Sequence, residues 1–355
     1  MVSIAELDIH VTNRCQLRCR HCCFDAGNHE LPELPPSRWF QVLNEAADMG
    51  VSDVDFTGGE PLLYNGLIDV IRKSIELGMN TTLQTNGLLL HDSRIVQLLD
   101  AGLRHVMISL DGWAESHEWL RGRGTFGLAL RAAERALDAG MQVRVNAVAM
   151  RSTVSRIPDL IRWAGAEGIP LVSVFAFTGQ GRGVCLRREE LSYEIWEESL
   201  REFSTVADQF PGLKILVEPA MGPLHPTLSK VSCPMLKRGY VQALCDGRAY
   251  QCTMLIFSDL FIADLSFESL MVCRSAARWN QLKAYLLHFS KGCPAYDTCK
   301  TGELGPDPRV SALQHPRFPL CPLMKRDLRS GALTLRSAEQ QGTRTTGHQK
   351  EASQS

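Results

Sequence analysis

The sequence predicts an α/β fold in which a parallel sheet is covered by helices, followed by a smaller and irregular carboxyl-terminal region. Six strand-like segments alternate with helix-like segments between residues 4 and 177. Parallel strands need long crossover connections, usually helices, so this alternation indicates six βα repeats. Regular hydrophobic periodicity becomes sparse after residue 183, and seven of the twelve cysteines lie between residues 233 and 321. We expect this second region to need a metal centre for its order.

Hydrophobic periodicity places the strands and helices of the first region. Leu7, Ile9 and Val11 alternate with polar residues and therefore share one face of the first strand. The five later strands are expected at Asp53–Phe56, Asn80–Gln84, His105–Ser109, Gln142–Val148 and Leu171–Ala176. Ser37 is the expected cap of the first helix, which Gly50 ends. Further helices are expected at Phe126–Ala139, Val154–Glu167 and Leu191–Phe210, with another strand-like segment at Lys214–Val217.

The composition argues against several classes of protein. The 355 residues include 38 basic and 39 acidic side chains, so no positive field favours nucleic acid or an anionic membrane surface. No apolar run approaches the roughly 18 residues of a membrane span, and the first residues lack the pattern of a signal peptide. Twelve cysteines in such a chain are more typical of metal binding than of disulfides, so we expect a cytoplasmic protein.

Three cysteines directly after the first expected strand are the most specific signal in the chain. Cys15, Cys19 and Cys22 have the spacing C-x3-C-x2-C. Three thiolates can bind three irons of a 4Fe-4S cluster and leave the fourth iron open, as a catalytic metal requires. Cys23 is adjacent to Cys22 and is poorly placed to reach the opposite corner of a cluster. The alternatives are a zinc site with His21 as its fourth ligand and a set of reduced structural thiols.

Three further motifs follow at the ends of the next expected strands. They are Thr57-Gly58-Gly59-Glu60-Pro61, Gln84-Thr85-Asn86-Gly87 and Ile108-Ser109-Leu110-Asp111-Gly112. Together with the cysteine triplet, and in this order, they resemble the signature of radical S-adenosylmethionine (radical SAM) enzymes. The resemblance implies an open (β/α)6 partial barrel whose functional residues lie at the carboxyl ends of the strands. It also implies two cofactors, a 4Fe-4S cluster and SAM itself.

The resemblance assigns roles to individual residues. The three cysteines bind the catalytic cluster, and Gly58, Gly59 and Glu60 hold the methionine ammonium of SAM. The other implied contacts with SAM are His21 near the adenine, Ser109 and Asp111 at the ribose, Arg121 at the carboxylate with Arg123 as its rival, and Asn146 inside the barrel.

The later cysteines resemble the SPASM and Twitch extensions, which carry auxiliary 4Fe-4S clusters in many radical SAM enzymes. The expected ligands are Cys233, Cys252, Cys293 and Cys299, with Cys321 as a rival. Gly247 suits a hairpin turn between the first two of them. The full SPASM pattern has cysteines where this chain has Ser290 and Glu303, so we expect one auxiliary cluster and not two. A four-cysteine zinc site is the alternative.

These patterns divide the chain into three parts. We expect the barrel at residues 1–215, the auxiliary-cluster domain at 216–336 and a disordered tail at 337–355, which is rich in Gln, Thr, Ser and Gly and has no large apolar residue. The cysteines outside the two ligand groups, Cys185, Cys245 and Cys273, are expected as buried small side chains.

The resemblance implies reductive cleavage of SAM to a 5′-deoxyadenosyl radical, which abstracts hydrogen from a substrate. Peptide-modifying relatives often carry a leader-binding domain before the barrel, and this sequence begins on the first strand, so we expect a small polar metabolite instead. An amino sugar, cyclitol or nucleoside of natural-product or antibiotic biosynthesis is the expected substrate class, and its reaction is an epimerisation, dehydrogenation or decarboxylation. For an epimerisation, Cys245 is the expected hydrogen-atom donor.

Two other functions stay open, and both use the same cluster motifs. The first is maturation of a ribosomal peptide, with a partner protein supplying leader recognition. The second, from another class, is an iron–sulfur electron carrier or redox sensor. The motifs for holding SAM argue against it, because a carrier or sensor does not need them. If the protein is a radical SAM enzyme, we expect a flavodoxin- or ferredoxin-type reductant as its partner.

Overall fold

The computed structural model describes residues 4–28, 31–218, 228–230, 239–251, 253, 256–257 and 261–274. Predictions that fall on other residues lie outside this part of the chain. They include the tail at 337–355 and the auxiliary-cluster cysteines Cys233, Cys252, Cys293, Cys299 and Cys321.

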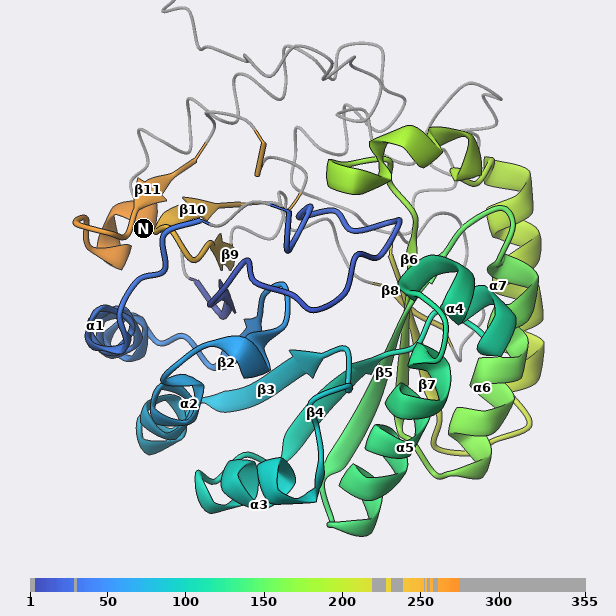
Figure 1. Ribbon diagram of the computed structural model, residues 1–355, viewed down its shortest axis with the longest axis horizontal. Helices are drawn as coiled ribbons and strands as arrows, with labels where there is room; N and C mark the ends of the chain where they lie inside the picture. The colour runs from blue at the N-terminus through green and yellow to red at the C-terminus, as the bar shows by residue number, and fades with distance from the viewer. Residues whose placement is uncertain are drawn as a thin grey trace, which may run out of the picture.

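The described strands form one eleven-stranded sheet in the order β11-β10-β9-β1-β2-β3-β4-β5-β6-β7-β8 (Figure 1). Neighbours from β9 to β8 run parallel, whereas β10 is antiparallel to both β9 and β11. The strands are β1 (Glu6–His10), β2 (Asp53–Thr57), β3 (Asn80–Thr85), β4 (His105–Ser109), β5 (Gln142–Ala149), β6 (Leu171–Ala176), β7 (Lys214–Glu218), β8 (Leu228–Lys230), β9 (Tyr240–Ala243), β10 (Arg248–Tyr250) and β11 (Ala263–Asp264).

Helices connect the parallel strands and cover the outer side of the curved sheet (Figure 1). They are α1 (Pro36–Asp48), α2 (Leu67–Glu76), α3 (Asp92–Asp100), α4 (Ala114–Arg121), α5 (Thr125–Asp138), α6 (Ile157–Ala166) and α7 (Tyr193–Ala207). Short 3-10 helices lie at Pro61–Leu63, Val154–Arg156, Gly181–Glu189 and Leu270–Arg274. No helix in the described part of the chain is long and apolar enough to cross a membrane.

Alternating side chains give the sheet two different faces. On β5, Val143 and Val145 are fully buried in the core beneath the helices. Arg144 and Asn146 alternate with them and lie on the opposite face, where they are only partly buried. We call this second face the inner face of the sheet. Its polar residues suit contact with a ligand, as in other barrels whose sites lie at the strand ends.

The predicted βα order is confirmed, because β1 to β6 coincide with the six expected strands and lie next to one another in chain order. The prediction that Ser37 caps the first helix was wrong. The helix begins at Pro36 with Pro35 in the capping position, and Ser37 lies inside its first turn. Proline suits this first turn because its missing N–H would have no helical partner there. The helix ends at Asp48, with Met49 as its C-cap directly before Gly50.

A strand from the carboxyl-terminal region extends the sheet beyond β1. Residues of β9 pair with β1 in parallel, with Leu7 opposite Val241 and Ile9 opposite Ala243. β7 and β8 extend the other side of the sheet beyond β6. The single sheet therefore contains strands from both sides of the boundary expected at residue 215, and the domain division stays a prediction.

Candidate functional site

The three amino-terminal cysteines lie on one loop, residues 11–28, at the carboxyl end of β1. We call it the cysteine loop. Its ends are tied to the sheet and to each other: Val11 donates to the carbonyl of Thr57 at 3.0 Å, and Gly27 donates to the carbonyl of Asn13 at 2.8 Å. Closing the loop in this way holds all three thiols above neighbouring strand ends, which is the region where the sequence predicts the site.

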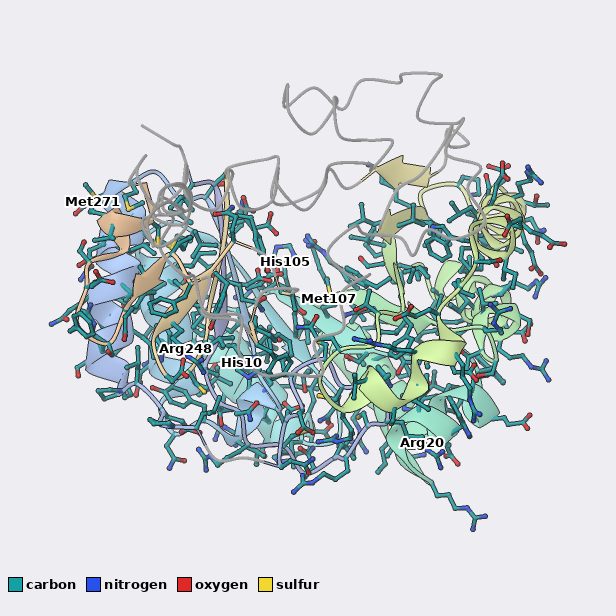
Figure 2. The ribbon with its side chains drawn as sticks, turned by 90° about the horizontal axis from the view of Figure 1, so that it is seen from above. His10, Arg20, His105, Met107, Arg248 and Met271 are labelled. Atoms are coloured by element: carbon teal, nitrogen blue, oxygen red, sulfur yellow. The ribbon has the colours of Figure 1, made fainter. Side chains whose placement is uncertain are left out.

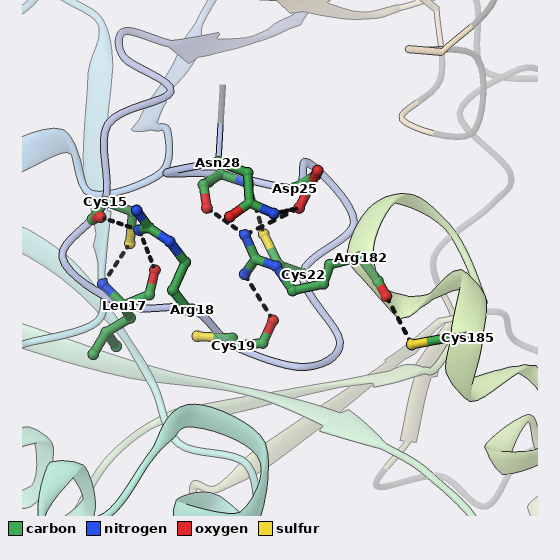
Figure 3. Close-up of polar contacts among 10 residues, drawn as sticks. Cys15, Leu17, Arg18, Cys19, Cys22, Asp25, Asn28, Arg182 and Cys185 are labelled. Carbon is green, nitrogen blue, oxygen red and sulfur yellow. Dashed lines mark hydrogen bonds and ion pairs between the residues drawn. The ribbon is translucent and has the colours of Figure 1, made fainter. Parts of the chain in front are cut away.

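An arginine from a distant segment fastens the cysteine loop (Figure 3). Arg182 follows β6 and donates from its guanidinium to the carbonyls of Cys19 at 3.0 Å and Ala26 at 2.6 Å. It also forms an ion pair of 3.0 Å with Asp25, and its backbone N–H donates to the carbonyl of Cys22 at 3.0 Å. Arg182 thereby anchors the backbone of the loop at Cys19, Cys22 and Ala26.

Peptide N–H groups point at two of the three sulfur atoms. Leu17 donates to the sulfur of Cys15 at 3.4 Å, and Ala26 donates to the sulfur of Cys22 at 3.3 Å. Such hydrogen bonds stabilise thiolate ligands and tune iron–sulfur clusters. Burial acts in the opposite direction and raises the pKa of Cys15 to about 11. The donor set of three thiols with peptide hydrogen bonds fits a cluster better than free, solvated cysteines.

The zinc alternative depends on His21. Its Nε2 lies 3.4 Å from a carboxylate oxygen of Asp111, and its Nδ1 is buried without a hydrogen-bond partner among the described residues. Among the described residues, no three histidine, cysteine or acidic side chains gather closely enough to hold one metal ion. Cubane ligands differ from those of a single ion, because each thiolate binds a separate iron.

Gly58 and Gly59 allow the second motif to pack directly on the cysteine loop. A side chain on Gly58 would collide with the carbonyl of Thr12, and one on Gly59 with the carbonyl of Arg14. The backbone N–H of Gly59 donates to Thr12 at 2.7 Å. These glycines were expected to let a ligand approach the backbone. In the structure it is the cysteine loop that approaches the backbone of both glycines closely.

Glu60 is fully buried and its carboxylate has three donors. Oε1 accepts from the backbone of Leu62 at 3.1 Å and from the hydroxyl of Thr85 at 2.8 Å, and Oε2 accepts from the backbone of Asn86 at 2.9 Å. Burial raises the pKa of Glu60 to about 7, and these hydrogen bonds offset part of that effect. Each carboxylate oxygen accepts two hydrogen bonds, so Oε2 keeps one position for a further donor such as an ammonium group.

Asp111 and Arg121 bind each other. Nε of Arg121 donates to Asp111 at 2.6 Å, and the other carboxylate oxygen accepts from the backbone of Val148 at 2.9 Å. Burial opposes ionisation of Asp111, but the charge and hydrogen bond of Arg121, together with His21 and His117, outweigh it and hold the pKa of this carboxyl well below its usual range. The resemblance gave these residues separate contacts with ribose and carboxylate, and those contacts stay predictions. Arg123 is exposed beyond the end of α4.

Ser109 and Asn146 lie side by side on the inner face. The register pairs Ser109 of β4 with Asn146 of β5, and Asn146 in turn with Ser173 of β6. Oδ1 of Asn146 and the hydroxyl of Ser173 are buried, and neither has a hydrogen-bond partner in the described part of the chain. Polar atoms buried without a partner are rare in folded proteins and often mark a missing ligand. Ser173 was not anticipated from the sequence.

The remaining cysteines differ in exposure. Cys245 and Cys273 are buried, as expected, and Cys245 lies in the turn between β9 and β10, where its carbonyl accepts from Leu34 at 2.8 Å. Cys185 was wrongly expected to be buried. It is exposed, and its thiol donates to the carbonyl of Arg182 at 3.3 Å.

Sequence reasoning also missed the residues that support the site. Thr85 and Asn86 were noted only as part of a strand-end motif, although they hold Glu60. Arg182 lies in the segment Gly179-Gln180-Gly181-Arg182-Gly183, whose three glycines were an available signal of close backbone contact. Indeed, a side chain on Gly181 would collide with the carbonyl of Cys23.

A parallel partial barrel with a three-cysteine loop and a buried carboxylate at adjacent strand ends defines a class of iron–sulfur enzymes. Residues 9–164 match the model of the radical SAM superfamily. This region of the chain belongs to that superfamily, whose members bind a 4Fe-4S cluster and SAM.

Curated relatives match about half of the chain. An AdoMet-dependent heme synthase of Oleidesulfovibrio alaskensis is 30% identical over 196 residues, which are 54% of this chain and 50% of the relative. A PqqA peptide cyclase of Methylocella silvestris is 33% identical over 187 residues, which are 52% of this chain and 49% of the relative. The chain thus spans about half the length of the curated relatives it matches.

Solved structures share the fold at low sequence identity. Streptococcus suis SuiB bound to S-adenosylmethionine is 20% identical with a TM-score of 0.66, and the match covers 79% of this chain and 68% of SuiB. The protein anSMEcpe with bound AdoMet is 15% identical with a TM-score of 0.61, and the match covers 84% of this chain and 88% of anSMEcpe. Both likenesses confirm a partial barrel with a carboxyl-terminal extension.

Proposed function

We propose that this protein reductively cleaves SAM and uses the resulting radical to abstract hydrogen from a peptide substrate. The observation that carries the radical SAM part is the packing of the cysteine loop on the Gly58–Glu60 turn, which joins three thiols and a buried carboxylate at one set of strand ends. The peptide part is supported by relatives named PqqA peptide cyclase and by the SuiB structure bound to its precursor peptide SuiA.

The chain's own residues would hold the cofactors as follows. The three cysteines of the loop bind the cluster, which supplies the electron for breaking a carbon–sulfur bond of SAM. Glu60 offers its free Oε2 position to the ammonium of SAM, with charge-assisted strength. Arg182 keeps the loop closed, and the buried Asp111–Arg121 pair fixes the end of α4 beside β5. Fixing these groups in advance reduces the cost of orienting SAM.

A small polar metabolite is the second candidate for the substrate. The heme synthase and an Fe-coproporphyrin III synthase among the relatives are named for non-peptide products. The polar inner face suits a hydrophilic ligand of either kind. Cys245 belongs to this candidate as the hydrogen-atom donor of an epimerisation. A pure electron carrier or redox sensor is disfavoured, because it has no use for a site that holds SAM.

Anaerobic reconstitution with iron and sulfide, followed by a strong reductant and SAM, tests the reaction. We expect 5′-deoxyadenosine and methionine in equal amounts by chromatography, and the absence of 5′-deoxyadenosine under every reductant would refute the proposal. Co-expression with candidate precursor peptides encoded beside the gene tests the substrate. A mass change in a peptide that depends on Cys19 supports the peptide reading, whereas turnover confined to small metabolites refutes it.

A further inference from the structure

The inner face of the sheet carries a second polar group, one register row below the Ser109–Asn146 row. The register aligns Gln84 of β3 with Met107 of β4, and Met107 with Arg144 of β5. Arg144 precedes Asn146 by two residues, which places it about 7 Å further from the strand ends at the usual rise of a β-strand. Figure 2 shows Met107 near the centre of the molecule, within the curve of the sheet.

Arg144 is the charged residue of this row. It forms no hydrogen bond or ion pair with any residue that the structure describes. The carboxylate of Asp55 is near enough to act on it electrostatically, but Asp55 instead accepts from Gln84 at 2.8 Å. A partly buried guanidinium whose contact with a carboxylate is only electrostatic loses hydration that no hydrogen bond replaces, which is costly unless a ligand supplies an acceptor.

Unsatisfied atoms next to Arg144 point to the same conclusion. Ser173 is 1% exposed, and its hydroxyl has no hydrogen-bond partner among the residues that the structure describes. The same holds for Oδ1 of Asn146 and Nδ1 of His105, which are also buried on the inner face. Three strands therefore present polar atoms without partners around one guanidinium. Structural networks usually satisfy such atoms internally, so this group has the character of a binding site.

We propose that Arg144 binds a carboxylate of the substrate on the inner face, and this assignment rests on the proposed function. A guanidinium has a planar fork of donors that matches a carboxylate in a bidentate arrangement. The neighbouring Asp55 disfavours the greater negative charge of a phosphate group. Because the Ser109–Asn146 row lies between Arg144 and the strand ends, a carboxylate on Arg144 holds the rest of the substrate toward the predicted SAM site. An acidic side chain of a peptide or the acid group of a metabolite satisfies this chemistry.

Matched acid and amide probes test the assignment in the reconstituted protein saturated with SAM. The probes are the acetylated and amidated peptides Ala-Ala-Glu-Ala-Ala and Ala-Ala-Gln-Ala-Ala, and the pair glutarate and glutaramide. Ligand-observed NMR under anaerobic conditions gives their dissociation constants. We expect the acid member of at least one pair to bind about tenfold more tightly than its amide, as for a charge-assisted hydrogen bond. This preference disappears in Arg144→Gln and is reduced but retained in Arg144→Lys, while SAM affinity is unchanged.

The control is Arg162→Gln, because Arg162 is an exposed arginine on α6 and its loss leaves the acid preference intact. The assignment is overturned if wild-type protein shows no acid preference in either pair, or if the preference survives in Arg144→Gln. A tenfold loss of SAM affinity in that variant would also overturn it, by assigning Arg144 to the cofactor. If Arg144→Gln does not fold, Arg144→Lys decides, since an unaltered preference there refutes bidentate binding. Normal 5′-deoxyadenosine formation without acid preference refutes this inference alone and leaves the proposed function standing.

Discussion

The affinity for SAM should rise with pH because of the environment of Glu60. Burial raises its pKa from 4.5 to about 7, so the carboxyl of the folded protein is largely protonated at pH 6. An ammonium group binds the carboxylate and not the neutral acid. The ionised fraction grows from roughly 9% at pH 6 to about half at pH 7, which predicts an increase of about fivefold in SAM affinity.

Equilibrium dialysis with radiolabelled SAM at pH 6.0, 6.5 and 7.0 measures this change at constant ionic strength. The range stops at pH 7 because α-amino groups begin to lose their proton near pH 7.7 to 8. Glu60→Gln should flatten the profile and weaken binding at pH 7 by about tenfold, since a charge-assisted hydrogen bond is lost. Glu76→Gln on the exposed end of α2 is the matched control and should keep the wild-type slope. A flat wild-type profile, or the same slope in Glu60→Gln, would refute the reasoning.

The same shift has a consequence for the protein without SAM. Its folded state holds a proton on Glu60 that the unfolded chain releases above about pH 4.5. The stability contributed by this proton is complete below pH 4.5 and falls as pH rises through 7, by at most about 3 kcal/mol. Urea denaturation at pH 5 and pH 7.5, with Glu60→Gln beside wild type, measures the difference.

Four further outcomes are expected. Iron and sulfide analysis of reconstituted protein should give about eight of each per chain, and replacing the three loop cysteines by alanine should remove about half. Asp111→Asn should cost about 3–5 kcal/mol in urea denaturation, because it leaves a buried arginine charge unpaired, whereas exposed Asp100→Asn costs under about 0.5 kcal/mol. Arg182→Met should speed iron loss to a chelator about tenfold, because Arg182 holds the cysteine loop. The side chain of Arg188 is 85% exposed, so Arg188→Met is the control and should leave the rate of iron loss unchanged. If the reaction is an epimerisation, Cys245→Ala should stop turnover but not SAM cleavage, and a product made in heavy water without deuterium would exclude this donor.

The fold was predictable because its strands carry a local pattern. Val143 and Val145 alternate with Arg144 and Asn146, and this period of two shows both the strand and its buried face. The first helix was predicted almost to its end, but its cap was not, because Ser37 is a stronger local signal than the prolines that actually begin it. Local preference is a weak guide where two prolines fix the backbone first.

The site was predictable in its ligands and not in its supports. Cys15 and Glu60 stand in recognisable motifs, so their chemistry follows from spacing. Arg182 holds the cysteine loop from about 160 residues away in the chain, and a single-chain pattern contains no record of such a contact. The role of Ser173 was equally hard to predict. Its hydroxyl becomes a candidate only when the strand register places it beside Asn146 and the structure shows that it is buried.

The pairing of β9 with β1 affects how the chain acquires its fold during synthesis. β1 is made first, but its partner strand on one side is made more than 200 residues later. Until then one edge of β1 presents free backbone groups that other chains can bind, a known route to aggregation. A product ending at residue 215 would keep this open edge permanently. Expression of the barrel alone should therefore give aggregates, and a chaperone that shields strand edges should raise the yield of the full-length protein.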